Sequence, residues 1–280
     1  MTTSYEIRYS NHPEDAKHYD TARLRKDFLV QNLMADGKVH MVYSMNDRFI
    51  AGGAVPKSDP LLLEAIDPLK AEHFCDRREL GIINVGSTGK IIVDDSEYLL
   101  KYKEALYIGA GTKKVIFSSE SAAHPARFYF NSAPAHKSFP TVHIPLEKAD
   151  IVELGSLESS NARKINKLIV NSVVDVCQLQ MGMTELKTGS VWNTMPAHLH
   201  SRRMEAYFYF EVPDDQAICH FMGEPKETRH IWLHNEEAVV SPSWSIHAAA
   251  GTSNYTFIWG MAGENLDYGD MDAFGPRDLK

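Results

Sequence analysis

Short runs of apolar and β-branched residues, each bounded by turn-forming residues, recur along almost the whole of this sequence. Four clear examples are Val39–Ser44, Ala105–Ile108, Ala206–Glu211 and Tyr255–Met261. Many short strands joined by tight turns are typical of sandwiches and barrels, because an antiparallel sheet buries its apolar face against a second sheet. The sequence therefore predicts an all-β fold.

Helical periodicity is confined to three short segments. Asp20 and Thr21 are suited to cap a helix that runs to Leu29. A second helix is predicted within Pro60–His73, interrupted at Pro68, and Ser159–Asn161 is suited to begin a turn or two that ends near Leu168. We expect these helices to be short additions to a β structure.

The predicted strands form two blocks whose order is similar. In the first block Arg77–Glu79 precedes an apolar strand, and Ala126–Phe130 closes the block. In the second block Arg202–Glu205 precedes the aromatic strand, and Tyr255–Trp259 closes it. A diverged duplication explains this order. We therefore expect two β-sandwich domains, 1–150 and 151–280, with the acidic, serine-rich segment 146–161 as the linker.

Charge and composition exclude several classes of protein. The chain has 280 residues, with 37 acidic and 29 basic side chains and a formal net charge of −8. This balance argues against nucleic acid as a partner, because nucleic-acid binders carry a basic face. No apolar run is long enough to span a membrane, and the first residues lack the layout of a secretory signal. The three cysteines have no disulfide-like spacing, so we expect reduced thiols and a cytoplasmic protein.

One group of residues has the spacing of a metal site. His198 and His200 are two positions apart, so on a strand both imidazoles point to the same face. Glu205 joins them only if the polar segment Ser201–Arg203 turns or bulges, because an offset of five reverses the face. His247 lies 42 residues beyond Glu205, which suits a strand that returns beside the first. Three imidazoles and a carboxylate suit zinc, iron, manganese or nickel.

The first block has no equivalent group of ligands. His73 is the only histidine near Arg77–Glu79, and the next histidine along the chain is His124. Lys113 and Lys114 fall about where the last ligand would lie. We therefore expect the first half to be structural, or to contribute to contacts between subunits.

The metal motif resembles that of the cupin superfamily, although Trp244 stands where the second cupin motif usually has glycine. Longer stretches resemble the 5-keto-4-deoxyuronate isomerase family, over essentially the whole chain. They are RRELGIINVG at 77–86, FYFNSAPAH at 128–136, WNTMPAHLHSRRMEAYFYF at 192–210, ETRHIWLHNEEAVVSPSWSIH at 227–247 and FIWGMAGEN at 257–265. The resemblance implies two cupin-like jelly-roll halves, a homohexamer and one zinc ion per subunit. It carries the zinc ligands over as His198, His200, Glu205 and His247.

The resemblance also implies a reaction. The expected enzyme is an aldose–ketose isomerase that converts 5-keto-4-deoxyuronate into 3-deoxy-D-glycero-2,5-hexodiulosonate during pectin breakdown, by proton transfer through an enediol. A metal ion would polarise the carbonyl and the adjacent hydroxyl, or would only hold strands together. The alternatives are a non-catalytic cupin that binds sugar acids and an iron dioxygenase with the same ligands.

The substrate is an anion and the protein is acidic, so a local cation must bind the carboxylate. Arg203 and Arg202, beside the ligands, are the first candidates, and Lys167 is the next. The identity of the catalytic base is unknown from the sequence. Three polar residues on strands expected near the metal are nominated for that role: His230, His234 and Glu237.

Overall fold

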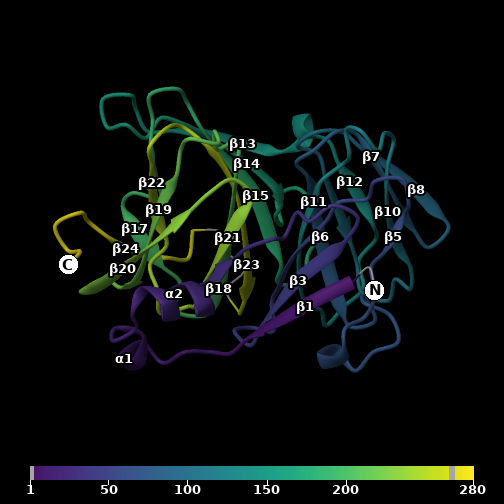
Figure 1. Ribbon diagram of the computed structural model, residues 1–280, viewed down its shortest axis with the longest axis horizontal. Coiled ribbons are helices and arrows are strands. Elements are labelled where there is room, and N and C mark those ends of the chain that lie inside the picture. Colours follow the sequence, from purple (N-terminus) through teal and green to yellow (C-terminus); the bar gives the residue numbers. More distant parts are fainter. Residues whose placement is uncertain (1–2, 265–268) are drawn as a thin grey trace.

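The computed structural model describes residues 3–264 and 269–280, and most of its regular structure is β-strand (Figure 1). The first sandwich consists of a seven-stranded sheet in the order β1-β3-β4-β11-β6-β9-β12 and a four-stranded sheet in the order β5-β10-β7-β8. Its strands are β1 (Thr3–Arg8), β3 (Val39–Ser44), β4 (Ile50–Ala54), β5 (Leu61–Leu62), β6 (Arg78–Asn84), β7 (Gly89–Val93), β8 (Ser96–Leu100), β9 (Ala105–Ile108), β10 (Val115–Ser119), β11 (Phe128–Pro134) and β12 (Val142–Ile144).

The second sandwich repeats this arrangement. Its large sheet has the order β13-β14-β15-β23-β18-β21-β2, and its small sheet has the order β16-β22-β19-β20. Its strands are β13 (Asp150–Leu154), β14 (Arg163–Ile169), β15 (Gln180–Leu186), β16 (Trp192–Asn193), β18 (Arg203–Phe210), β19 (Ile218–Glu224), β20 (Glu227–Leu233), β21 (Glu237–Ser241), β22 (Ala248–Gly251), β23 (Thr256–Gly263) and β2 (Leu29–Val30). Two further strands, β17 (Ala197–Leu199) and β24 (Asp272–Phe274), pair with each other. The predicted all-β fold of two similar blocks is confirmed.

The two sandwiches are joined through their large sheets, so the sheets form four layers (Figure 1). One hydrophobic core lies between the two large sheets, and each sandwich has another core of its own. At the junction the ring of Tyr129 from β11 stacks on the ring of Phe208 from β18, with centroids 4.4 Å apart. Close packing of this kind makes the junction part of the folded core.

Strand β18 contributes side chains to two of these cores. Because its side chains alternate between the two faces of the sheet, the strand positions the functional residues. Met204 and Phe208 belong to the core between the large sheets. Tyr207 and Tyr209 belong to the core inside the second sandwich, and Glu205 has the same parity. Because side chains alternate along a strand, Glu205 points into the second sandwich.

A buried carboxylate also links the two halves. The side chain of Glu79 in β6 is fully buried and accepts hydrogen bonds from the backbone N–H groups of Cys177, Gln178 and Leu179, at 2.7–2.8 Å. The hydroxyl of Tyr107 donates a fourth, at 2.8 Å. A buried charge needs such partners, so Glu79 fixes the segment that leads into β15 against the first half.

Only one of the three predicted helices is present as predicted. Helix α2 (Thr21–Phe28) begins after Asp20, whose side chain accepts from the N–H of Arg23. Within Pro60–His73 the structure has strand β5 and the single 3₁₀ turn η1 (Asp67–Leu69), because Leu61 and Leu62 pair with β10. The prediction of a helix after Ser159–Asn161 is also wrong. The residues that follow form β14, which pairs with β13 on one side and with β15 on the other.

The N-terminal arm packs on the second sandwich. Strand β2 pairs with β21, and α1 (Pro13–Ala16) and α2 contact strands β19, β20 and β21. The expected linker 146–161 contains the 3₁₀ turn η2 (Leu146–Lys148) and strand β13. The division into domains 1–150 and 151–280 stays a prediction. No helix in the described ranges is long and apolar enough to cross a membrane.

Candidate metal centre

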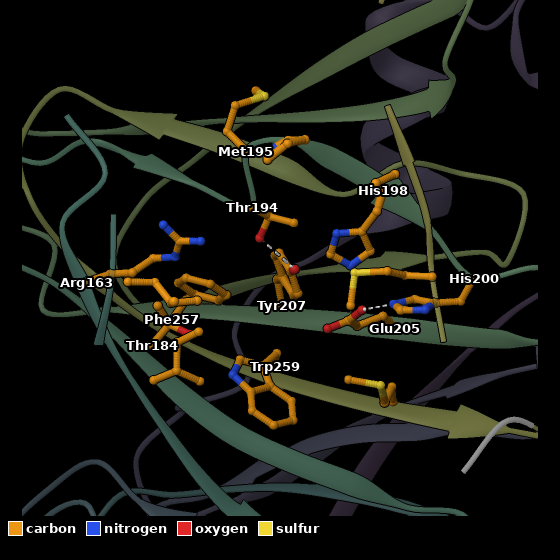
Figure 2. Close-up of a pocket in the computed structure, with 16 residues that line it drawn as sticks. Arg163, Thr184, Thr194, Met195, His198, His200, Glu205, Tyr207, Phe257 and Trp259 are labelled. Atoms are coloured by element: carbon orange, nitrogen blue, oxygen red, sulfur yellow. Dashed lines mark hydrogen bonds and ion pairs between the residues drawn. The ribbon is translucent and has the colours of Figure 1, made fainter. Parts of the chain in front are cut away.

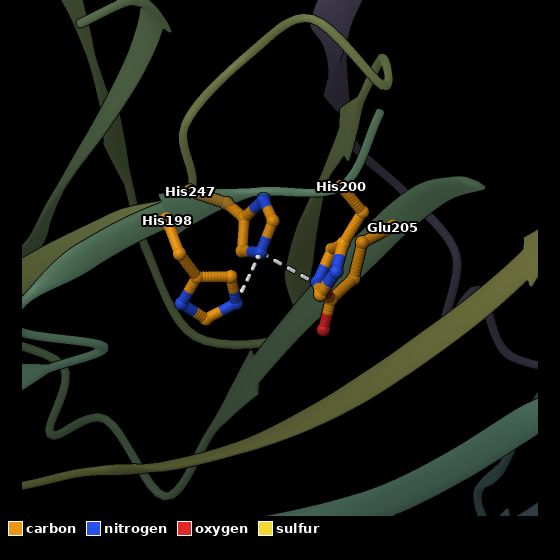
Figure 3. A group of neighbouring side chains, drawn as sticks. All are labelled: His198, His200, Glu205 and His247. Atoms are coloured by element: carbon orange, nitrogen blue, oxygen red, sulfur yellow. Dashed lines mark hydrogen bonds and ion pairs between the residues drawn. The ribbon is translucent and has the colours of Figure 1, made fainter. Parts of the chain in front are cut away.

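Three histidines and one glutamate meet at one end of the second sandwich. His198 lies on β17, His200 directly follows that strand, Glu205 lies on β18, and His247 directly precedes β22. One nitrogen or oxygen atom from each side chain lies within 4.8 Å of the corresponding atoms of the others (Figure 3). We call these four residues the His–Glu centre. The structure thus brings together the whole predicted ligand set.

The distances within the His–Glu centre are short. Nε2 of His247 lies 2.8 Å from Oε2 of Glu205 and 3.0 Å from Nε2 of His198. Nε2 of His200 lies 3.2 Å from the same carboxylate oxygen. Residues 201 and 202 form a turn between β17 and β18, which brings Glu205 to the side of the two histidines. The turn predicted for this segment is therefore present.

The C-terminal segment sets the orientation of His200. Nδ1 of His200 lies 2.8 Å from the backbone carbonyl of Asp270 and 3.1 Å from Nη2 of Arg203. The carbonyl only accepts hydrogen bonds, so the tautomer that it favours has the proton on Nδ1. In the neutral ring Nε2 then presents a lone pair to the carboxylate of Glu205. Electron-pair donors that face each other in a buried site are mutually repulsive unless a cation lies between them. The donor set therefore fits a bound metal ion.

Burial and charge favour the protonation states that bind metal. Burial, followed by the nearby His247, lowers the pKa of His198 to about 2. Burial alone would raise the pKa of the Glu205 carboxyl, but His247 and His200 lower it more, so it lies well below its ordinary value. At neutral pH the imidazole of His198 is therefore neutral and Glu205 is ionised. Three nitrogen donors and one oxygen donor, without sulfur, suit a divalent ion of borderline softness.

A cavity of about 250 Å³ opens beside the His–Glu centre (Figure 2). His198, His200 and Glu205 lie at one end of it, and Arg163 lies at the other, with Tyr207 between them. The complete set of lining residues is Leu154, Arg163, Ile165, Thr184, Thr194, Met195, Pro196, His198, His200, Glu205, Tyr207, Phe257, Trp259, Met261, Met271 and Ala273. The cavity thus combines a metal-binding end, a cationic end and a largely apolar wall.

Tyr207 lines the cavity near the His–Glu centre, and its hydroxyl forms a hydrogen bond. Its ring centroid lies 5.3 Å from that of His247, and its hydroxyl lies 3.0 Å from the hydroxyl of Thr194. The side-chain amide of Asn193 donates to the same Thr194 oxygen at 2.9 Å. The hydroxyl of Tyr207 is therefore positioned beside the space where a metal-bound substrate would lie.

The two predicted substrate arginines do not line the cavity. Arg203 is buried, and its Nη2 donates to the carbonyl of Asp270 at 3.2 Å, the carbonyl that also binds His200. Arg202 is exposed and forms an ion pair with Glu264. Direct contact with a substrate in the cavity would require a rearrangement of this turn. Their role in substrate binding stays a prediction.

The other nominated residues lie elsewhere. Lys167 forms an ion pair with Asp150 at 3.0 Å and does not line the cavity. His230 and His234 are exposed, and the carboxylate of Glu237 accepts from the backbone N–H of His234. None of these three residues lines the cavity, because β20 is the outer strand of the small sheet and the carboxylate of Glu237 faces the turn before β21. Their nomination as the base stays a prediction.

Within the described ranges the structure brings together one group of three or more metal-binding side chains, and this group is the His–Glu centre. In the first half His73 contacts Asp76 at 3.2 Å and has no second histidine in that group. Sequence reasoning missed Arg163, Thr194 and the carbonyl of Asp270, which are remote from the motif in the chain. Tyr207 could have been predicted from the sequence, since it lies two positions after Glu205 and therefore on the same face of the strand.

The sequence matches one protein-family model and is similar to several named relatives. A model of the KduI/IolB family matches residues 28–273. Relatives from Formosa agariphila and Bacteroides fragilis are 60% and 61% identical over 280 residues, and each match covers 100% of both chains. Both relatives are named 4-deoxy-L-threo-5-hexosulose-uronate ketol-isomerase.

Solved structures give the same fold at low identity. An IolB-like protein from Salmonella typhimurium superposes with a TM-score of 0.65 at 14% identity, covering 81% of this chain and 86% of that one. An oxalate decarboxylase from Bacillus subtilis superposes with a TM-score of 0.55 at 10% identity, covering 81% and 71%. The predicted fold of two cupin-like sandwiches is therefore confirmed.

Proposed function

The chain belongs to the KduI/IolB family, and on that premise we propose that its His–Glu centre is the reaction centre of a ketol-isomerase. The protein is an enzyme, an intramolecular oxidoreductase that converts 4-deoxy-L-threo-5-hexosulose uronate into 3-deoxy-D-glycero-2,5-hexodiulosonate. One observation supports the site assignment above all others: four side chains converge as a metal-binding group, and three of them, His198, His200 and Glu205, line one end of a cavity.

The reaction moves two hydrogens within one molecule. The substrate has an aldehyde at C1 and a hydroxyl at C2, and the product has a hydroxyl at C1 and a ketone at C2. A base must remove the C2 hydrogen as a proton, and an acid must return a proton to C1, with an enediol between the two steps. The four side chains of the His–Glu centre would hold a divalent ion, which would supply Lewis acidity to the reaction.

We assign the proton transfer to Tyr207. Tyr207 lines the cavity, its ring packs against that of His247, and its hydroxyl lies 3.0 Å from the hydroxyl of Thr194. Because Asn193 donates to Thr194, the Thr194 hydroxyl is able to donate to Tyr207 and so stabilise its oxygen when it gives up its proton. Tyr207 is then placed to take a proton from one substrate position and return it to the adjacent one.

Two groups position the ligands rather than touch the substrate. The carbonyl of Asp270 binds Nδ1 of His200, and Arg203 donates to that same carbonyl. Hydrogen bonds to a metal-binding imidazole fix its orientation and its tautomer. In this proposal Arg203 supports the metal site, and the alternative that Arg203 and Arg202 clamp the substrate carboxylate predicts a change in KM without loss of metal.

The metal that we propose is zinc, one ion per subunit. Zinc suits three imidazoles and one carboxylate, and it performs no redox chemistry, as an isomerisation requires. The experiment is to remove metal with a chelator, add back zinc, iron or manganese singly, and measure conversion of the keto-deoxyuronate both with and without dioxygen. Conversion that returns with zinc alone supports the proposal. Turnover that needs iron and dioxygen would indicate a dioxygenase, and binding without turnover would indicate a non-catalytic cupin.

We also propose a cytoplasmic homohexamer. Strands β3 and β4 of the first half are almost entirely buried within the subunit. Exposed apolar side chains instead lie at the edge of the second large sheet, at Ile151, Leu154 and Leu157. Light scattering of the parent and of a Leu154→Glu variant tests this surface. The two fully buried cysteines, Cys75 and Cys177, suit a reducing compartment.

A further inference from the structure

We propose that Arg163 binds the carboxylate of the substrate and so determines the specificity of the enzyme for acidic sugars. This inference rests on the proposed function, because it names the group that recognises one end of the substrate of that site. The substrate carries its aldehyde at C1 and its carboxylate at C6. A protein with a net charge of −8 needs a local cation to bind such an anion.

The sheet register places Arg163 on the same face as the catalytic residues. Within β14, Arg163 and Ile165 share one face, and Ile165 pairs with Thr184 in β15. Thr184 pairs with Phe257 in β23, and Phe257 has the same parity as Trp259, the partner of Tyr207. All of these side chains line the cavity (Figure 2).

Arg163 is the only lysine or arginine among the described residues that line the cavity. The surrounding wall is largely apolar, with Ile165, Phe257 and Trp259 nearby. An apolar wall lowers the local dielectric constant, which strengthens the attraction between a guanidinium and a carboxylate. Arginine is also suited to this role by shape, since its planar fork meets both carboxylate oxygens.

The backbone holds the Arg163 side chain in place. Its Nη1 donates to the carbonyl of Asn161 at 3.0 Å. The Asn161 side chain in turn accepts from the N–H of Ser156 at 3.1 Å, which fixes this loop. An anchored guanidinium loses less conformational entropy when it binds a ligand than a mobile one does.

These positions also determine which end of the substrate reacts. In Figure 2 Arg163 lies across the cavity from Glu205 and His200, with Tyr207 between them. A carboxylate bound at Arg163 leaves the aldehyde end of the chain at the His–Glu centre. The arrangement therefore favours sugars with an acidic group at the end remote from the aldehyde, and a neutral aldose lacks the contact that aligns it.

The test compares Arg163→Met with Lys164→Met in the metal-loaded enzyme. Lys164 is the next residue in β14, on the opposite face of the sheet, and so it is a matched control for loss of one positive charge. Binding of the keto-deoxyuronate is measured by titration of tryptophan fluorescence, and turnover is measured separately. The same titration uses the C6 amide of the substrate, which is uncharged.

We expect Arg163→Met to weaken binding of the acid by about 10- to 100-fold, since a charged hydrogen bond is lost. The C6 amide should bind parent and variant within about 3-fold of each other, and metal content and thermal unfolding should stay at parent values. Arg163→Lys should recover part of the affinity. Lys164→Met should bind the acid like the parent.

Equal binding of the acid by Arg163→Met and the parent would overturn the proposal. Equal losses for the acid and the amide would also overturn it, because they would indicate a structural role for Arg163. The outcome for the proposed function is read separately, from turnover by the parent enzyme. A parent that binds the acid through Arg163 but converts none of it would refute the isomerase assignment and leave this inference intact.

Discussion

Leu80 occupies in the first sandwich the place that Glu205 occupies in the second. Leu80 is the third residue of β6, a strand that lies between β11 and β9. Glu205 is the third residue of β18, which lies between β23 and β21. Lys114 directly precedes β10, as His247 directly precedes β22. The repeated fold therefore has equivalent strand positions in both halves, but among the described residues only those of the second half have metal-binding side chains there.

Replacement of one ligand should release the metal. We expect His247→Ala to fall well below one ion per chain after dialysis against a chelator, because three protein ligands bind more weakly than four. The measurement is metal content by elemental analysis. His73→Ala is the control in the first half and should keep the parent content. Full metal in His247→Ala would contradict the ligand assignment.

Removal of one hydroxyl should slow the reaction without emptying the site. Tyr207→Phe should lower kcat by about 10²- to 10⁴-fold, the usual contribution of a positioned acid or base. Metal content should be unchanged, because Tyr207 is not a ligand. Tyr209→Phe is the control, since Tyr209 contacts His220 and does not line the cavity. A kcat of Tyr207→Phe close to that of the parent would assign the proton transfer to another group.

Loss of the Glu79 charge should weaken the link between the two halves. Glu79→Gln puts an amide NH₂ against backbone donors, so we expect the free energy of unfolding to fall by about 2–4 kcal/mol. The control is Glu97→Gln on the surface, where Glu97 pairs with Lys90 and the loss should be below about 0.5 kcal/mol. Denaturant unfolding of both variants checks this prediction. Equal losses would mean that Glu79 has no special role.

Acid should destabilise the protein partly through His220. Burial lowers the pKa of His220 to about 3, so between pH 6.5 and pH 3 the unfolded chain binds a proton at this residue and the folded chain does not. The unfolded state then holds more protons, so stability falls as the pH falls below about 6.5, by about 1.4 kcal/mol at most for each pH unit.

The measurement is denaturant unfolding at pH 7.5 and pH 5.5 for the parent and for His220→Phe. We expect the parent to lose about 1 kcal/mol more than the variant over this interval. His230→Gln, at an exposed position, should follow the parent. A variant with the same pH dependence as the parent would show that His220 is protonated in the folded protein.

Local sequence patterns predicted many of the strands, and they also indicated that the four side chains of the His–Glu centre lie together. The run from Val39 to Ser44 is a strand with those bounds, and Ala105–Ile108 is another. The convergence of these side chains was predictable because His198 and His200 are two positions apart in an extended segment, and Glu205 follows after a turn. Period-two alternation carries this information within one segment.

The errors arise where tertiary pairing overrides local preference. The segment after Ser159 has a helix-capping pattern, but β14 pairs with a strand on each side and is extended. Arg163 reaches the cavity only because β14, β15 and β23 lie side by side, and no local pattern records that order. The strand order also explains why His230 and His234 lie away from the cavity, since β20 is the outer strand of the small sheet.

The pairing of β2 with β21 also has a consequence for synthesis of the chain. Val30 pairs with Ala238, 208 residues later, so the ribosome makes one edge of the second sheet long before its neighbour. At about 5–20 residues per second this delay is about 10 to 40 s, during which α2 and β2 have no partner sheet. The N-terminal arm therefore stays unpaired while the first sandwich is made, and the half that contains the His–Glu centre is completed last.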